Sequence, residues 1–444
     1  MRDTIDIAKK LVSKQPVDSW EIYITSSESF RAEVKESTVD SFQRSNLQGM
    51  SVRVIKGHRP GFSFCSSSDP QNIEKTIIKA VDMAGVMPED DSLGFTPGRK
   101  GSSEHRQLLD EKLLGMPEKE KIEIARIIEK EAYDFDKRIK VARTSGYVDS
   151  ITRVRLINSL GLDVQDEAGM STAWVELMAE DAQEQETSYW FDQVRNPYML
   201  QPSMIARKAA GRAIRALGGK TVKSEKLPVI FENTTASGLL GVISSSFVAE
   251  NHFKKTASPK VLQGAELFSV KLDIIDDGTD ERGELAFGFD GEGVETCKTV
   301  LVDGGVVKSW LYDRYYGAKF GQPSTGNSRR GGFETPPTSG ITNFSIRPGT
   351  VSLEEMLKLM GNGLLVTEMM GLHTANPVSG DFSVGASGFK VSNGLIDHPV
   401  KGIAIAGNLI DLFGKIAEIG SDFEFFGNIG ACSVLCESIA VSGS

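Results

Sequence analysis

Short β-rich segments separated by glycine-containing turns dominate the chain from about residue 223 to its end. Segments such as KTVLVDGGVVKSWLYD and FKVSNGLIDHPV place strand-forming residues on both sides of tight turns at 303–305 and 393–394, and this pattern predicts hairpins. Few helices are expected here, over 235–249, 312–320 and 353–361. Residues 223–444 are therefore predicted to form a Gly-rich, mainly β domain with a helix embedded near its start.

The first 105 residues combine an amphipathic helix, expected over 3–14, with several strand-like segments that end at GFSFCSS. Asp69 as N-cap and Pro70 in the first turn predict the start of a second helix. Residues 86–105 are rich in Pro, Gly, Ser and Asp, which is typical of a linker.

Residues 106–222 repeat the combination of strands and helices. A charged helix is expected to begin at Pro117, a hairpin turn at 159–161, and a basic helix over 203–217. The basic face of this last helix is expected to be solvated or to contact another domain. The predicted fold class is α+β, with domains at 1–105, 106–222 and 223–444, because 444 residues are too many for one core.

Composition argues against several partners. The net charge is −10 and the pI is about 5.3, whereas DNA and anionic membranes attract cationic surfaces. The sequence has no run of about 18 apolar residues that would predict a transmembrane helix. Four scattered cysteines form no disulfide framework and fit a reducing cytoplasm. We therefore expect a cytoplasmic protein that binds neither nucleic acid nor membrane.

The segment GLLGVISSSFVAENHF, from Gly238 to Phe253, follows the buried-strand pattern LPVIFEN and carries three consecutive serines. A serine nucleophile needs a base within hydrogen-bond reach, and no G-x-S-x-G turn is present. Small hydroxyl residues on a helix also permit close packing against a strand. The structural interpretation of Ser244, Ser245 and Ser246 is therefore favoured over a catalytic one.

The sequence does not assemble a metal site or a phosphate loop. None of its five histidines is three to five residues from another, and no H-E-x-x-H occurs. Cys432 and Cys436 are spaced C-x-x-x-C in an apolar stretch, where cysteines are more often buried than ligating. The run GNGLLV at 361–366 lacks the third glycine of a dinucleotide-binding loop.

Two runs of small residues are candidates for binding. STGNSRR at 324–330 exposes consecutive backbone N–H groups beside paired arginines, which suits carboxylates or backbone carbonyls, but also fits a tight turn with solvated arginines. DFSVGASGF at 381–389 alternates small residues in a β context. That pattern permits an extended peptide to add as a strand, or a tight sheet corner.

Several runs together resemble the TldD/PmbA family, whose members were once called modulators of DNA gyrase. They occur in family order across about 220 residues: ASGLLG, FDGEGVETCKTVLVDGGVVKSWLYD, STGNSRR, NGLLVTEMMG, NPVSGDFSVGASGFKVSNGLIDHPVKGIAIAGNL and IGSDFEFFGNIG. The first two blocks fit the family layout more loosely. The resemblance implies a metallopeptidase family that degrades or trims small unfolded peptides in the cytoplasm.

The resemblance also implies that this chain lacks the family's metal chemistry. TldD-type members carry H-E-x-x-x-H on the helix after the strand and a cysteine near the C-terminus; they bind zinc, and the Glu acts as general base. Val242, Ile243 and Phe247 stand at those positions here, and no His or Glu lies between Gly238 and Ala249. Cys432 stands near the family's C-terminal cysteine, but one thiolate cannot hold a catalytic zinc.

The chain accordingly resembles the PmbA branch, also called TldE. The resemblance implies a non-catalytic subunit without a cofactor, which completes a peptide-binding chamber while a TldD-type partner supplies zinc; self-association into a homodimer is the other possibility. The expected peptide-binding residues are Ser324, Thr325, Gly326, Asn327, Arg329, Arg330, Gly385, Ser387 and Gly388. Three alternatives stay open: an active hydrolase with an unrecognised site, a gyrase- or DNA-associated regulator, and a stand-alone peptide-binding scaffold.

Overall fold

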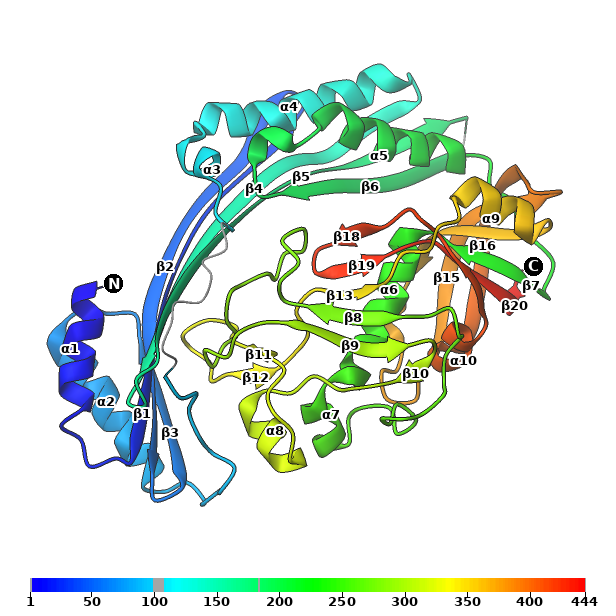
Figure 1. The fold of residues 1–444 in the computed structure, drawn as a ribbon. Helices are drawn as coiled ribbons and strands as arrows, with labels where there is room; N and C mark the ends of the chain where they lie inside the picture. Colours follow the sequence, from blue (N-terminus) through cyan, green and yellow to red (C-terminus); the bar gives the residue numbers. More distant parts are fainter. Residues whose placement is uncertain (1, 99–107, 183, 444) are drawn as a thin grey trace.

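The computed structural model describes residues 2–98, 108–182 and 184–443. Its first half is one six-stranded antiparallel sheet in the order β3-β2-β1-β4-β5-β6. The strands are β1 (Ser19–Lys35), β2 (Thr38–Lys56), β3 (Arg59–Cys65), β4 (Ile139–Asn158), β5 (Asp163–Asp181) and β6 (Glu184–Val194). The long sheet arches over the second half of the chain (Figure 1).

Helices cover the outer face of this arch (Figure 1). Toward one end lie α1 (Arg2–Val12) and α2 (Pro70–Ala84); toward the other lie α3 (Glu111–Gly115), α4 (Glu118–Phe135) and α5 (Pro202–Ala216). Alanines of α5 and apolar residues of α4 pack on the sheet in one buried cluster, and a second cluster lies under α1 and α2. Asp69 caps α2 by accepting the backbone N–H of Gln71, as the sequence predicts.

The second half contains a small barrel. Its strands are β7 (Glu225–Phe231), β14 (Gly363–Met370), β15 (Asp381–Ser392), β16 (Leu395–Asn408), β17 (Ile416–Ile419) and β20 (Val434–Ser442). The barrel closes because β16 pairs with both β15 and β20, and β17 adds to β20. The turn at 393–394 joins β15 to β16, as predicted. Helix α9 (Leu353–Met360) packs on one side of the barrel strands through Met356, Leu357 and Met360.

A second sheet lies beside the barrel, in the order β10-β9-β8-β13-β19-β18. Its strands are β8 (Ile274–Asp277), β9 (Lys298–Asp303), β10 (Val306–Val307), β13 (Phe344–Ile346), β18 (Glu424–Phe426) and β19 (Ile429–Ala431). Helix α6 (Asn233–Ser244) packs against both, because Leu239 and Leu240 share one buried cluster with Val229 of the barrel and Phe344 of this sheet. This cluster is the main core of the second half.

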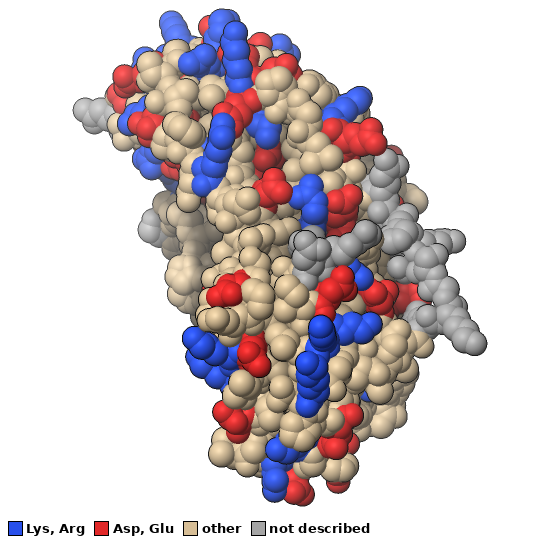
Figure 2. Space-filling view, turned by 90° about the vertical axis from the view of Figure 1, so that its left-hand side faces the viewer, with Lys and Arg blue, Asp and Glu red and all other residues tan. Residues whose placement is uncertain are grey.

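Smaller elements complete the described part of the chain. They are α7 (Ala249–Lys254), α8 (Arg314–Phe320), α10 (Leu409–Gly414), the short pair β11 (Ser328–Arg329) and β12 (Thr338–Ser339), and the 3₁₀ turns η1 (Pro197–Met199), η2 (Ser245–Phe247) and η3 (Leu372–Thr374). On the face shown in Figure 2, basic and acidic side chains are interspersed. Within the described ranges, no helix is long and apolar enough to cross a membrane.

The structure confirms the α+β class with a β-rich second half. The helix predicted over 235–249 is wrong in extent: α6 ends at Ser244, and a new helix begins at Ala249. Val248 is extended between them because the backbone from Phe247 to Ala249 pairs with Leu311. The domain boundary predicted at 105/106 lies outside the described residues, and the strands on its two sides belong to one sheet.

Candidate functional site

Helix α6 presents one partly accessible stripe. It follows the buried strand β7, and its half-buried residues recur at helical spacing: Thr234, Gly238, Gly241, Val242 and, just after the helix, Ser245. The opposite residues of the helix are buried in the core. The stripe is therefore the most accessible part of α6, and its N-terminal end lies beside Thr235 and Ser237.

The residues at the family's metal-binding positions are apolar and packed. Val242 lies in the accessible stripe, whereas Ile243 is 3% exposed and Phe247 is fully buried. The Phe247 ring contacts the rings of Phe268 and Phe344, with centroids 6.4 and 5.7 Å away. Neither side chain has a lone pair to donate, so these positions cannot ligate a metal.

Cys432 does not change this conclusion. It is fully buried in the same apolar cluster as Ile243 and Phe247. Burial, and then the negative charge of Asp422, raise the pKa of its thiol to about 12, which disfavours the thiolate that a metal needs. Among residues 2–98, 108–182 and 184–443, no three His, Cys, Asp or Glu side chains are grouped so that they could hold a metal ion. The described donor set does not fit zinc.

The three serines are engaged in local structure. Ser244 Oγ donates to the carbonyl of Gly241 at 2.7 Å, and Ser245 Oγ to the carbonyl of Val242 at 3.3 Å. Ser246 Oγ donates to the carbonyl of Pro377 and accepts the backbone N–H of Ser258. These contacts support the structural interpretation of the run.

His252 does not act as a base for them. Its Nε2 contacts the carbonyl oxygen of Ser246 at 2.7 Å, not a serine hydroxyl, and its ring stacks on Trp310 with centroids 3.7 Å apart. Burial lowers the pKa of His252, against the effect of that carbonyl. The histidine and the serines therefore do not form the nucleophile–base pair that serine catalysis requires.

The loop at 324–327 is held by internal hydrogen bonds. Ser324 Oγ and Thr325 Oγ1 both lie 3.1 Å from the carbonyl of Tyr312, and Asn327 Nδ2 donates to Asp276 at 2.7 Å. Gly326 has a φ of +74°, and a Cβ there would lie 2.5 Å from the carbonyl oxygen of Glu295. The polar groups of this loop thus fix its own conformation. Gly326 is required because a side chain at that position would clash with the carbonyl of Glu295.

Arg330 joins the two halves of the protein. Its side chain is 2% exposed, and its Nη2 lies 2.5 Å from Glu21 Oε1 on β1. The guanidinium also donates to the carbonyl of Gly291 at 2.6 Å and stacks over the ring of Tyr23. Arg53 extends the network by pairing with Glu21 at 3.2 Å and with Glu292 at 3.6 Å.

Arg329 and Arg330 line a cavity of about 220 Å³ between the sheet and the second half of the chain. Asp290, which also lines it, accepts the backbone N–H groups of Ser328, Glu292 and Val294. Burial, followed by the charge of Glu292, nevertheless raises the pKa of Asp290 to about 7. Ser387 and Gly388 line a different cavity, so the structure does not bring the two predicted groups into one pocket.

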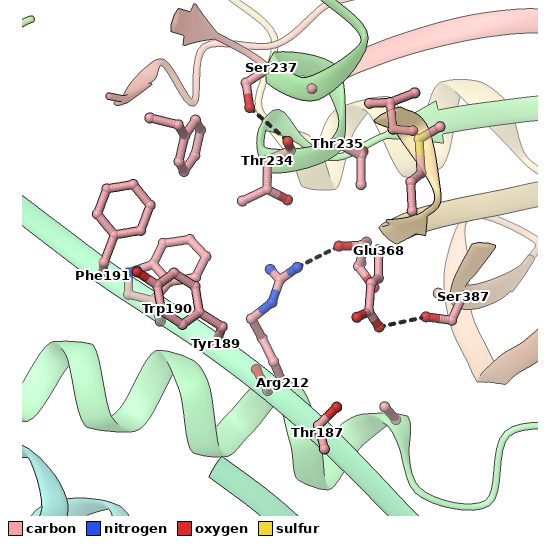
Figure 3. A pocket seen from close by; sticks show the side chains of 18 of the residues that line it. Thr187, Tyr189, Trp190, Phe191, Arg212, Thr234, Thr235, Ser237, Glu368 and Ser387 are labelled. Atoms are coloured by element: carbon pink, nitrogen blue, oxygen red, sulfur yellow. Dashed lines mark hydrogen bonds between the residues drawn. The ribbon is translucent and has the colours of Figure 1, made fainter. Parts of the chain in front are cut away.

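That second cavity lies between the arched sheet and the accessible stripe of α6 (Figure 3). Its volume is about 360 Å³. One wall is β6 with Thr187, Tyr189, Trp190 and Phe191; α5 contributes Arg212. The other wall comes from α6, β14, η3 and β15, and includes the sequence-predicted Ser387 and Gly388, with Gly385 nearby on β15.

Hydrogen bonds tie the polar residues of this cavity together. Arg212 Nη1 donates to Glu232 at 2.5 Å, and its Nη2 donates to the carbonyl of Thr367 at 2.6 Å. Ser387 Oγ donates to Glu368 at 3.0 Å (Figure 3). The basic helix predicted over 203–217 thus makes an interdomain contact, which was one of the two expectations for it.

Sequence reasoning missed Tyr189, Trp190, Arg212 and Glu368. The signal in the sequence was the aromatic run SYWF on a strand whose neighbours are polar. Two further cavities, of about 410 and 370 Å³, also reach Trp190. Within the described residues, β6 pairs only with β5, so a row of cavities follows the unpaired edge of this strand.

Comparisons with known proteins agree along the chain. The family model for PmbA/TldA metallopeptidase domain 1 matches residues 20–84, that for the central domain 111–217, and that for the C-terminal domain 224–443. The metalloprotease PmbA of Escherichia coli O157:H7 is 28% identical over 100% of this chain and 96% of its own length. A PmbA homolog of Buchnera aphidicola subsp. Baizongia pistaciae is 31% identical over 72% of this chain and 70% of its own.

Solved structures share the fold. A Thermotoga maritima protein described as a modulator of a DNA gyrase matches with a TM-score of 0.91 and 29% identity, over 99% of this chain and 100% of its own. TldE from Thermococcus kodakarensis matches with a TM-score of 0.90 and 24% identity over 100% of both chains. The family models and relatives together show that this chain belongs to the PmbA/TldD metallopeptidase family.

Proposed function

We propose that this chain is a PmbA/TldE-like, non-catalytic subunit of a cytoplasmic metallopeptidase that cleaves small unfolded peptides. The observation that carries the proposal is the chemistry of α6 in a family member. Val242, Ile243 and Phe247 are apolar, and two of them are packed in the core. A TldD-type partner would supply the zinc, and the chamber wall would come from this chain.

The edge of β6 supports a role in holding peptide. An unpaired strand edge offers backbone N–H and C=O groups to which an extended peptide can add without regard to its sequence. The edge of β6 meets the row of cavities that separates it from α6 and β18. Ser387 and Gly388 lie in the same space, so we retain them, with neighbouring Gly385, as proposed peptide contacts.

The run at 324–330 supports a different role. Ser324, Thr325 and Asn327 are bonded to the protein itself, and Arg330 is paired with Glu21. A peptide would have to displace these bonds to reach the same groups. Within the proposed subunit, this run holds the β-rich half against the arched sheet.

The test is reconstitution. Cleavage of an unstructured peptide is assayed with three samples: this chain, a TldD-type homologue that carries H-E-x-x-x-H, and their equimolar mixture. Zinc content and mass in solution are measured on each sample. We expect zinc and cleavage only in samples that contain the homologue, the highest cleavage in the mixture, and a complex of the two chains by light scattering. Cleavage by this chain alone, free of contaminating peptidase, would overturn the proposal.

A matched variant shows whether this chain's site matters to the complex. Arg212→Ala removes the two hydrogen bonds that hold Glu232 and Thr367 at the cavity, whereas Arg207→Ala alters an exposed arginine of the same helix. We expect the first variant to lower cleavage by the mixture and the second to leave it unchanged. Equal activity of both mixtures would argue that this cavity is not part of the chamber.

A further inference from the structure

The cavity between β6 and α6 has a lining that suits one class of side chain. Tyr189 is 51% exposed although it is a large ring, and its centroid lies 5.9 Å from that of Phe191. Phe191 in turn packs edge-on against Phe426 at 6.2 Å. Aromatic rings that are partly exposed and gather in a concavity mark a binding surface, because burying them against a ligand removes apolar area from water.

The cationic group of the cavity is already paired, whereas the Glu368 carboxylate accepts a serine hydroxyl and has no cationic partner among the described residues. Arg212 is satisfied by Glu232 and the Thr367 carbonyl, and Ser387 donates to Glu368. The guanidinium of Arg212 and the ammonium of Lys208 also lie over the ring of Trp190, at 5.3 and 4.4 Å from its centroid. A cationic ligand would find that ring occupied, and an anionic one would have to displace Glu232. The aromatic rings of the lining therefore favour an apolar group, and Arg212 offers no free charge to an anion.

Size and strand geometry agree with this chemistry. An apolar cavity of about 150 Å³ is enough for benzene, and this one is about 360 Å³ and partly open to solvent. Tyr189 and Phe191 are two residues apart on β6 and so project to the same face of the strand. A peptide added to the edge of β6 would place every second side chain on that face, beside the two rings.

We infer that this cavity is a side-chain pocket that takes one bulky apolar or aromatic residue of an extended peptide. The inference rests on the proposed function in one respect, that the ligand is a peptide. The inference adds a substrate preference to the proposed function: this subunit, although it has no metal ligands, selects peptides that carry a bulky apolar or aromatic side chain. The pocket and the first turns of α6 share Thr234, Ser237 and Gly238, so the selected residue would lie within about one helical turn of Val242.

Binding by this chain alone tests the inference separately from cleavage. The probes are fluorescent, end-capped peptides of about ten Gly and Ser residues with one central guest: Ala, Leu, Phe or Lys. We expect the Phe and Leu peptides to bind the full chain roughly tenfold to a hundredfold more tightly than the Ala peptide, as burial of one such side chain implies. The Lys peptide, whose ammonium can reach Glu368 but whose side chain buries less apolar area against the rings, should bind less tightly than the Phe and Leu peptides.

Two variants locate the pocket. Gly238→Leu fills it, because a Cβ on Gly238 would lie 2.8 Å from Leu372 Cδ2 and both residues line the cavity. Gly115→Leu is the control, since a Cβ there meets nothing within 4 Å. We expect the first to abolish the preference for Phe over Ala and the second to keep it. Tyr189→Ala, at an exposed ring, should reduce the preference without affecting folding measured by circular dichroism.

Equal affinity for Phe and Ala guests, or no detectable binding of any peptide, would overturn the inference. So would a preference that survives in folded Gly238→Leu and Tyr189→Ala proteins. The reconstitution assay decides the proposed function by its own readouts, zinc content and cleavage. A subunit that completes an active complex but shows no guest preference would keep the proposed function and lose the pocket.

Discussion

Arg330 lies at the centre of a buried network between the arched sheet and the β-rich half. Removing its side chain leaves the buried Glu21 with Arg53 as its remaining cationic partner, and losing one partner of a buried charge costs up to about 3–5 kcal/mol. We therefore expect Arg330→Ala to lower the free energy of unfolding by about that amount, measured by urea denaturation. Arg347→Ala is the matched control, because the Arg347–Asp273 pair is half exposed and should contribute about 1 kcal/mol or less. Similar losses in the two variants would contradict a structural role for Arg330.

Asp313 provides a pH-dependent contribution to stability. It is buried, and it caps α8 by accepting the backbone N–H of Tyr316 at 2.7 Å. Burial, and then the charge of Glu292, raise its pKa to about 6, compared with about 4 in an unfolded chain. Because the folded state holds this proton more tightly, the contribution of Asp313 to stability falls as pH rises from about 4 through about 6.

Asp313→Asn isolates this effect, because Asn is also a good N-cap residue and carries no charge. Between pH 4 and pH 7, the wild type should lose up to about 3 kcal/mol more of its unfolding free energy than the variant does. Urea denaturation at a series of pH values measures both proteins. Asp276 and Asp290 titrate in both, so their contributions cancel in the difference. Parallel pH curves would show that Asp313 does not titrate as described.

At the residue scale, contacts between neighbours in the sequence were predictable, and contacts between residues far apart in the sequence were not. Asp69 caps its helix because the cap and its partner are two residues apart. Arg212 donates to a carbonyl 155 residues away, and Ser387 to Glu368 across a strand pair, so no local pattern indicates either contact. Arg330 was predicted as a peptide contact because two arginines in a Gly-Ser turn suit anions; its partner Glu21 is 309 residues away.

At the scale of the element, α6 explains why metal chemistry is not recovered by substitution. Replacing Val242, Ile243 and Phe247 with His, Glu and His would bury a carboxylate and remove a core ring, which costs about 3 kcal/mol or more. We expect the triple variant to unfold at lower urea concentration and to retain no stoichiometric zinc after dialysis, measured by elemental analysis. Val242→His alone, at the half-buried position, should be tolerated. One zinc per chain in the triple variant would show that the scaffold still supports a site.

The same helix shows where element prediction stops. The hairpins at 303–305 and 393–394 follow from turn residues that sit beside each other, and both form. The end of α6 was misplaced because Ser245 to Ala249 keeps an apolar, helix-compatible composition. The β-bridge between Val248 and Leu311 holds this segment extended, and Leu311 lies more than 60 residues further along the chain. Strand β6 was expected as a strand, but its position at the sheet edge depends on the order of all six strands.

At the scale of the whole molecule, the arched sheet determines which pieces can fold alone. β1 pairs with β4 from Glu21–Asn158 to Val34–Ser145, so a cut at the predicted boundary near residue 105 would separate the two central strands. We propose instead that residues 1–222 behave as one unit and 223–444 as another. A fragment ending at 105 would leave the inner edge of β1 without its partner, and an unpaired long edge aggregates.

Separately expressed fragments test this division. Fragment 1–222 should unfold cooperatively in urea, because both buried clusters of the sheet and its helices lie within it. Fragment 1–105 should not. Fragment 1–222 should still be less stable than the full chain, because Glu21 keeps Arg53 but loses Arg330. Mixing it with 223–444 should restore part of that loss, and Arg330→Ala in the second fragment should prevent the recovery. Cooperative unfolding of fragment 1–105 alone would contradict this division. It would show that β1–β3 fold without the pairing between β1 and β4.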